Sequence, residues 1–181
     1  MKKVLFIDRD GTLIHETHDE LVDSFEKLEF LPKVFRNMHK IKQNLDYELV
    51  IVTNQDGLGT PVFPEEKFWP VHHWMLRAFS NEGVDFDEIF IDRHYPEDNS
   101  TTRKPGTGML TKYMNGGYDL ANSYVIGDRV TDMMLARNLG TKGILINDGS
   151  LKGEINENDL DAFCVSITND WDEIYKVVSR S

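Results

Sequence analysis

Two aspartates stand where an apolar segment ends near the amino terminus. In F-I-D-R-D-G-T-L-I, apolar residues run directly into Asp8 and Asp10, and a glycine follows. Buried strand ends disfavour carboxylates unless something there offsets their charge. Solvated turn residues are the plain alternative, and a calcium-binding loop is a sharper one. The calcium loop is excluded, because counting from Asp8 its sixth position would need glycine and is Leu13, and its twelfth would need glutamate and is Asp19.

Polar residues also follow later apolar segments. These are Thr53, Asn54 and Gln55 after L-V-I-V, Arg103 and Lys104 in a loop before Pro105, and Asp128 with Asp132 after Y-V-I-G. If the segments are parallel strands, their carboxyl ends lie at one edge of a sheet and bring these side chains together. Each has an ordinary alternative: a strand end and turn for Thr53–Asn54, a loop charge for Lys104, and a residue of a first helical turn for Asp132.

Such a set of side chains is suited to phosphoryl transfer. Three aspartates brought together repel one another unless a divalent cation joins them, and hard oxygen ligands select Mg²⁺. The Thr53 hydroxyl and the Lys104 ammonium would hold phosphate oxygens. One carboxylate can attack phosphorus to form an acyl phosphate, while a second gives a proton to the leaving group and later takes one from water.

Short apolar segments alternate with helix-period segments along the chain. The predicted strands are Val4–Ile7, Leu49–Val52, Glu88–Ile91, Ser123–Ile126, Gly143–Ile146 and Phe163–Ile167. Several of them are apolar at successive positions, which is typical of strands covered on both faces. We therefore predict an α/β fold with a doubly wound, mostly parallel, Rossmann-like sheet, as a single domain over residues 1–181.

Four helices are predicted between or after these strands. They are Pro32–Ile41, Val71–Ser80, Thr131–Leu139 and Trp171–Val178. Pro70 is expected to begin the second helix and to separate it from a short turn at Glu65–Phe68. The segments His15–Glu26 and His94–Gly108 are predicted to be irregular loops.

Composition excludes several classes of function. Twenty Lys and Arg against 31 Asp and Glu give a formal net charge of −11, which disfavours nucleic acid and anionic membranes as partners. A small phosphorylated substrate remains compatible, because local charges decide binding within a Debye length of about 8 Å. One cysteine allows no disulfide framework, and no segment approaches the ~20 apolar residues of a membrane span. We expect a cytoplasmic protein.

The motifs D-R-D-G-T, T-N, R-K-P and G-D-x-x-x-D, in this order, resemble those of the haloacid-dehalogenase-like phosphatases. The resemblance covers nearly the whole chain and implies that family's fold, here with a minimal cap. It implies Asp8 as the nucleophile and Asp10 as the general acid and base. The implied Mg²⁺ ligands are Asp8, the backbone carbonyl of Asp10, and Asp128, with Asp132 supporting the metal and Lys104. The implied ligand contacts are Thr53, Asn54 and Lys104 for phosphate, and Gln55 and Arg103 for the rest of the substrate.

A closer likeness concerns the substrate. F-I-D-R-D-G-T-L-I, T-N-Q-D-G-L-G-T and A-N-S-Y-V-I-G-D-R resemble the histidinol-phosphate phosphatase part of a bifunctional enzyme of histidine biosynthesis. This implies L-histidinol phosphate as the substrate and a fused imidazoleglycerol-phosphate dehydratase domain as a partner absent from this chain. A heptose bisphosphate phosphatase is the alternative substrate class. A receiver-like signalling module, which shares an acidic cluster, a threonine and a lysine, is the alternative of another kind.

One departure from the resemblance concerns zinc. Members of the family often carry a zinc-binding loop with several cysteines before R-K-P. Here the segment reads I-D-R-H-Y-P-E-D-N-S-T-T-R-K-P, which retains His94 and contains no cysteine. One histidine is too few for a four-ligand structural zinc site. We predict that no zinc binds and that the loop is either ordered by other means or mobile.

Overall fold

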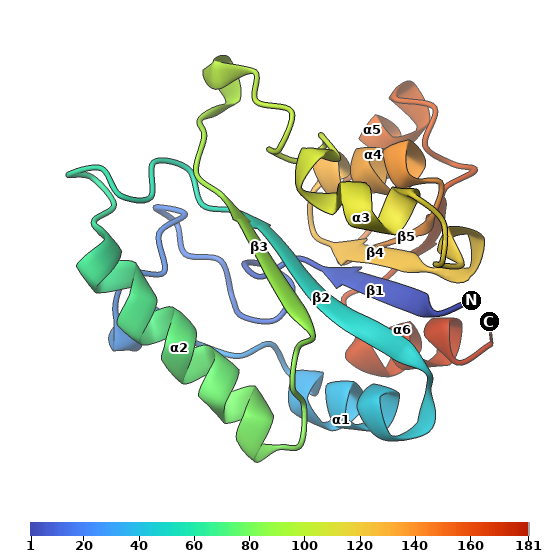
Figure 1. Ribbon diagram of the computed structural model, residues 1–181, viewed down its shortest axis with the longest axis horizontal. Coiled ribbons are helices and arrows are strands. Elements are labelled where there is room, and N and C mark those ends of the chain that lie inside the picture. Colours follow the sequence, from blue (N-terminus) through green and yellow to red (C-terminus); the bar gives the residue numbers. More distant parts are fainter. Residues whose placement is uncertain (181) are drawn as a thin grey trace.

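A computed structural model describes residues 1–180, and within them six parallel strands form one sheet (Figure 1). The strands are β1 (Lys3–Ile7), β2 (Tyr47–Asn54), β3 (Glu88–Asp92), β4 (Tyr124–Gly127), β5 (Lys142–Leu145) and β6 (Cys164–Ile167). Their order across the sheet is β3-β2-β1-β4-β5-β6, and every neighbouring pair is parallel. The predicted fold class is confirmed, with strand bounds shifted by one or two residues.

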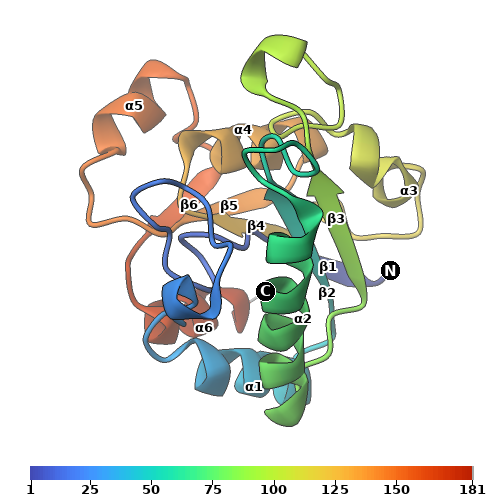
Figure 2. The ribbon, with the colours of Figure 1, turned by 90° about the vertical axis from the view of Figure 1, so that its left-hand side faces the viewer.

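Helices cover both faces of the sheet (Figures 1 and 2). They are α1 (Val34–Asn44), α2 (Glu65–Asn81), α3 (Thr111–Met114), α4 (Val130–Leu139), α5 (Lys152–Glu157) and α6 (Trp171–Val178). Leu5 and Ile7 of β1 pack with α1, α2 and α6, whereas Val4 and Phe6 pack with α3 and α4. Successive side chains of a strand point to opposite faces, so the run V-L-F-I is buried in two layers at once.

The chain reverses its direction of travel across the sheet at β1. It first proceeds from β1 through β2 to the edge strand β3, and then returns to the other side of β1 to form β4, β5 and β6. The carboxyl ends of β2, β1 and β4 therefore lie side by side at this switch point. In doubly wound sheets the ligand crevice opens at such a point.

Pro70 does not begin the second helix, and that prediction is wrong. Helix α2 starts at Glu65 and continues through Pro70 to Asn81. A proline removes one backbone hydrogen bond, but here apolar side chains on both sides of it, including Phe68 and Val71, are buried. Burial of that continuous apolar face outweighs the lost bond. No helix within residues 1–180 is long and apolar enough to cross a membrane.

Candidate active site

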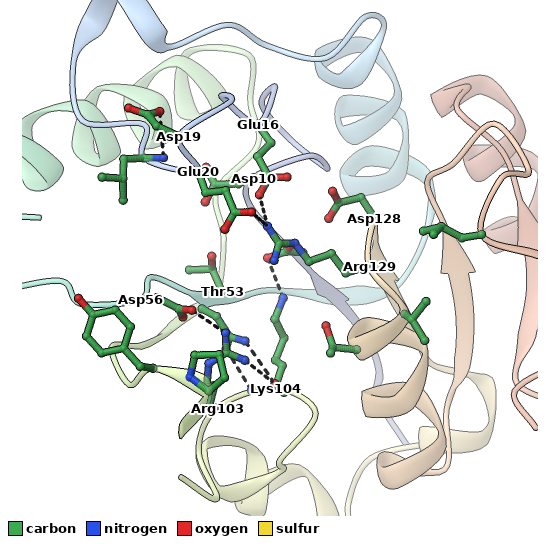
Figure 3. Close-up of a pocket in the computed structure, with 18 of the residues that line it drawn as sticks. Asp10, Glu16, Asp19, Glu20, Thr53, Asp56, Arg103, Lys104, Asp128 and Arg129 are labelled. Carbon is green, nitrogen blue, oxygen red and sulfur yellow. Dashed lines mark hydrogen bonds and ion pairs between the residues drawn. The ribbon is translucent and has the colours of Figure 1, made fainter. Parts of the chain in front are cut away.

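Most of the predicted site residues line one cavity at the carboxyl ends of β1, β2 and β4, and Figure 3 labels Asp10, Thr53, Arg103, Lys104 and Asp128 among them. Asp8 directly follows β1, Thr53 is the second-last residue of β2, and Asp128 directly follows β4. Asp132 lies in the first turn of α4, and Lys104 reaches in from the loop after β3. The sheet topology places Asp8, Thr53 and Asp128 together, since their three strands are neighbours.

Two glycines allow the acidic residues to approach the backbone closely. Gly11 has a φ of +71°, and a Cβ placed on it would lie 2.0 Å from Oδ2 of Asp128. A Cβ on Gly127 would lie 2.2 Å from Cγ of Asp132. Any side chain at either position would displace a carboxylate of the site.

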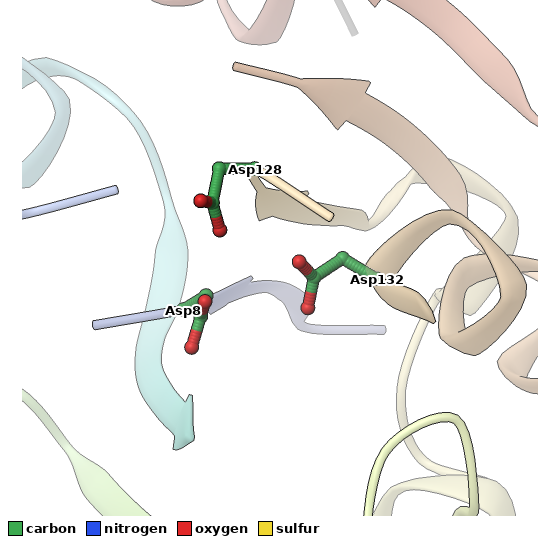
Figure 4. A group of neighbouring side chains, drawn as sticks. All are labelled: Asp8, Asp128 and Asp132. Carbon is green, nitrogen blue, oxygen red and sulfur yellow. The ribbon is translucent and has the colours of Figure 1, made fainter. Parts of the chain in front are cut away.

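Asp8, Asp128 and Asp132 form an acidic cluster (Figure 4). One oxygen from each carboxylate lies within 4.8 Å of the others. Burial, with mutual repulsion added, raises the pKa of Asp8 to about 7 and that of Asp128 to about 8. Oδ1 of Asp128 is buried and has no hydrogen-bond partner. An all-oxygen donor set with an unpartnered carboxylate oxygen fits a hard divalent cation such as Mg²⁺.

Lys104 supplies the positive charge inside this cluster. Its ammonium lies 2.7 Å from Oδ1 of Asp8 and 2.8 Å from Oδ1 of Asp132, and the side chain is only 4% exposed. Burial by itself would lower the pKa of Lys104, but the adjacent carboxylates of Asp132 and Asp8 outweigh it and raise that pKa. Lys104 is therefore a fixed cation beside Asp8.

Asp10 is held by two buried donors. Arg9 Nη1 donates to Oδ1 of Asp10 at 2.7 Å, and Gln55 Nε2 donates to Oδ2 at 2.6 Å. The same Gln55 nitrogen lies 2.9 Å from the Thr53 hydroxyl and donates to it as well. Gln55 is 3% exposed and is not among the residues that line the cavity. The structure thus does not bring Gln55 to the cavity, where a substrate contact was predicted.

Asn54 clamps the backbone of Lys104. Its Oδ1 accepts from the Lys104 N–H at 3.0 Å, and its Nδ2 donates to the Lys104 carbonyl at 3.3 Å. One amide hydrogen of Asn54 is left for a ligand, and its direct contact with phosphate stays a prediction. Arg103 lines the cavity and donates to Asp56 at 2.7 Å, so its contact with the substrate also stays a prediction.

A cavity of about 740 Å³ opens over these residues. Its outer wall carries acidic side chains that we name the acidic rim: Glu16, Asp19, Glu20 and Asp56. Three of the four lie in the segment predicted only as an irregular loop, which lines the cavity. An ion pair between Glu16 and Arg129 joins this segment to the start of α4. Sequence reasoning missed this rim; the density of acids in H-E-T-H-D-E, directly after the first motif, was the available signal.

The loop before Lys104 is ordered around Asp92, the last residue of β3. Asp92 is 3% exposed and accepts hydrogen bonds from the backbone N–H of His94 at 2.9 Å and from the hydroxyl of Thr102. Although burial opposes it, these hydrogen bonds lower the pKa of Asp92. A buried carboxylate thus joins the two ends of the loop, and these hydrogen bonds hold the loop in an ordered conformation.

Comparisons with known proteins agree with this geometry. A family model described as HAD-hydrolase-like matches residues 101–167. The bifunctional histidine biosynthesis protein HisB of Bacteroides fragilis is 55% identical over 175 residues, which are 96% of this chain and 46% of that protein. HisB of Spirosoma linguale is 52% identical over 184 residues, covering 97% of this chain and 48% of that protein. The chain spans about half the length of the curated relatives it matches.

Solved structures show the same architecture. The D,D-heptose 1,7-bisphosphate phosphatase of B. bronchiseptica, complexed with magnesium and phosphate, has a TM-score of 0.83 and 26% identity, covering 99% of both chains. The heptose bisphosphate phosphatase of Burkholderia thailandensis shares the fold, with a TM-score of 0.69 and 20% identity over 99% of this chain and 100% of that one. With its motifs at adjoining strand ends, this chain belongs to the haloacid-dehalogenase-like hydrolases.

Proposed function

We propose that this chain is a Mg²⁺-dependent phosphomonoester phosphatase that works through an aspartyl-phosphate and acts on L-histidinol phosphate. The observation that carries the proposal is the position of Asp8, whose carboxylate lies at the strand end beside Lys104 and within the acidic cluster. A carboxylate so placed is a nucleophile with a ready-made site for the anion that it attacks.

The metal would be held by Asp8, Asp128 and the backbone carbonyl of Asp10, and bound Mg²⁺ would neutralise charge on the phosphate. Asp132 would act indirectly: it accepts from Lys104 at 2.8 Å and from the Arg129 backbone N–H at 3.0 Å, which fixes the ammonium and the start of α4. The orphaned oxygen of Asp128 supports this assignment.

Two chemical steps follow from the arrangement. In the first, an Asp8 oxygen bonds to phosphorus while the ester P–O bond breaks, and Asp10 gives its proton to the departing alkoxide. In the second, Asp10 takes a proton from water, the water oxygen bonds to phosphorus, and the bond from Asp8 to phosphorus breaks. Lys104 and Thr53 would bind the remaining phosphate oxygens in both steps.

Histidinol phosphate is favoured over the alternatives by charge. Acidic side chains outnumber basic ones among the residues lining the cavity. They favour a leaving group that carries an amine and an imidazole, whereas the second phosphate of heptose bisphosphate would meet the acidic rim. The relatives named as histidine biosynthesis proteins support the same choice. The similarity to a heptose bisphosphate phosphatase keeps that sugar phosphate as the second candidate.

The deciding experiment compares substrates. Purified protein with Mg²⁺ is given histidinol phosphate or heptose 1,7-bisphosphate, and phosphate release is followed. We expect kcat/KM for histidinol phosphate to be at least about tenfold higher, a difference of about 1.4 kcal/mol. The opposite ranking would favour the sugar phosphatase. Uptake of one phosphoryl group without turnover would favour the receiver-like module and reject the phosphatase.

We also propose a cytoplasmic location and an imidazoleglycerol-phosphate dehydratase unit as partner. Support comes from the resemblance to a biosynthetic enzyme and from relatives that are named bifunctional. The residues assigned above to nucleophilic attack, proton transfer and phosphate binding all lie in this chain, so we expect the phosphatase to turn over without that unit. Activity that appears only after a dehydratase unit is added would contradict this independence.

A further inference from the structure

Gln55 lies behind the cavity rather than in it. It directly follows β2, and its backbone is fixed at both ends: its N–H donates to the Asp92 carbonyl at 2.7 Å, and its carbonyl accepts from Leu58 at 3.1 Å. Its side chain is 3% exposed and does not line the cavity. A polar side chain in such a place is kept for the groups that it contacts.

Both hydrogens of the Gln55 amide are used within the site. One N–H donates to Oδ2 of Asp10 at 2.6 Å and the other to Oγ of Thr53 at 2.9 Å. An amide nitrogen has two hydrogens, so none is left for a substrate. One amide therefore bridges the proposed acid and base and the proposed phosphate-binding hydroxyl.

The contact fixes Asp10 from behind. The other oxygen of Asp10 accepts from Arg9, whose side chain is fully buried and whose guanidinium lies 5.0 Å from the ring centre of Phe68. With a donor on each oxygen, the Asp10 carboxylate has little rotational freedom. Proton transfer is sensitive to such placement, since a misplacement of about 1 Å can cost roughly 10² in rate.

The contact also sets the direction of the Thr53 hydroxyl. A hydroxyl has one hydrogen and two lone pairs. Because the Gln55 N–H occupies a lone pair, the Thr53 hydrogen is left to donate to an acceptor in the cavity, which Thr53 lines. A phosphate oxygen is such an acceptor.

We infer that Gln55 is a positioning residue, whose single amide holds the Asp10 carboxylate and orients the Thr53 hydroxyl, so that proton transfer and phosphate binding depend on it together; this inference rests on the proposed phosphatase function. It differs from the substrate contact expected from sequence. A residue in contact with the leaving group affects binding of that group, whereas Gln55 should affect kcat and the binding of phosphate itself.

The test uses Gln55→Met, which keeps the length of the side chain and removes both donors. We expect kcat to fall about 10- to 100-fold and the inhibition constant of inorganic phosphate to rise several-fold. Gln43→Met, at an exposed glutamine of α1, is the matched control and should leave both values unchanged. If the methionine variant melts at a much lower temperature, Gln55→Asn, which is too short to reach both partners, replaces it.

A double-variant cycle makes the test specific. In a Thr53→Val background, Gln55→Met should not raise the phosphate inhibition constant further, because the hydroxyl that it orients is absent. An unchanged kcat in Gln55→Met, or a higher KM for histidinol phosphate with unaltered phosphate inhibition, would overturn the inference while leaving the phosphatase intact. A wild-type protein that releases no phosphate from any monoester would overturn the proposed function and this inference with it.

Discussion

Two clusters of charged residues in this chain differ in how completely their charges are matched. In the acidic cluster of three largely buried carboxylates there is one ammonium, that of Lys104, and it contacts only Asp8 and Asp132. A second cluster joins α1 to α6, where Lys33 and Arg36 pair with Asp170 and Asp172 on the surface. There the hydrogen bonds from Arg36, Asn37 and Lys33 lower the pKa of Asp172, and those from Lys33 lower the pKa of Asp170.

The balance of charge distinguishes the candidate active site from a surface cluster that only links two helices. The surface cluster is balanced and solvated, and its carboxylates ionise more readily than usual. The buried cluster has more negative than positive charge, and its carboxylates Asp8 and Asp128 resist ionisation. A surplus of buried negative charge is unfavourable in the empty protein and becomes useful when a cation and a phosphate enter.

The largest expected effect comes from removing the nucleophile. Asp8→Asn should lower kcat by more than about 10⁴-fold, because an amide cannot form the phosphoenzyme. The measurement is phosphate release from histidinol phosphate, with the melting temperature as a check on folding. Turnover within tenfold of the wild type would show that Asp8 is not the nucleophile.

Replacing the proton-transfer group should have the next largest effect. Asp10→Asn is expected to slow both chemical steps, by about 10²- to 10⁴-fold overall, and to let phosphoenzyme accumulate. Intact mass after an acid quench would reveal one phosphoryl group per chain. Asp46→Asn, at an exposed aspartate between α1 and β2, is the control. Unaltered rates for Asp10→Asn would show that another group transfers the proton.

Metal-free protein should lose stability as pH rises. The folded-state pKa values of Asp8 and Asp128, about 7 and about 8, lie above the ordinary value of 3.8, so the folded state binds more protons in this window. The contribution of these two carboxyl groups to the free energy of unfolding is fully present below pH ~4, and it is lost as the pH rises through their folded-state pKa values.

We expect the melting temperature of the metal-free protein to fall by on the order of 5 °C between pH 5 and pH 8. Adding Mg²⁺ should raise the melting temperature more at pH 8 than at pH 5. Differential scanning calorimetry with and without Mg²⁺ measures both effects. Asp128→Asn should lose most of the response to Mg²⁺. A melting temperature that rises over this range would show that the cluster ionises without cost.

The smallest effect is expected in the surface cluster. Arg36→Ala should change the melting temperature by no more than about 2 °C and leave kcat unchanged, because exposed ion pairs are screened by solvent and salt. The comparison uses low and high salt, since salt should reduce the difference between variant and wild type. A drop as large as that expected for the buried cluster would erase the distinction between the two.

Much of the fold was predictable because several strands, β1 and β2 above all, contain continuous apolar runs that are followed by polar motifs. All six strands were located from short apolar segments, and helix α6 has its predicted bounds, Trp171–Val178. The Asp170 side chain caps this helix by accepting from the backbone N–H of Asp172 at 2.9 Å. The prediction that Pro70 begins a helix used local backbone preference alone. It failed because burial of apolar side chains along α2 stabilises a helix that continues through Pro70.

The candidate site was less fully predictable. Strand ends indicate which residues converge, but not how their side chains are paired. The roles of Asn54 as a clamp on Lys104 and of Gln55 as a donor to Asp10 depend on contacts between segments far apart in the chain. The acidic rim was missed for the same reason, since an irregular loop has no periodicity that reveals where it folds.

The bare backbones of Gly11 and Gly127, pressed against Asp128 and Asp132, leave the reaction centre almost no tolerance for altered shape. The loop that carries Glu16 and Glu20 contains no glycine packed in this way. New substrate preferences, whether natural or engineered, should therefore arise from substitutions in that outer loop, while the residues of the acidic cluster stay the same.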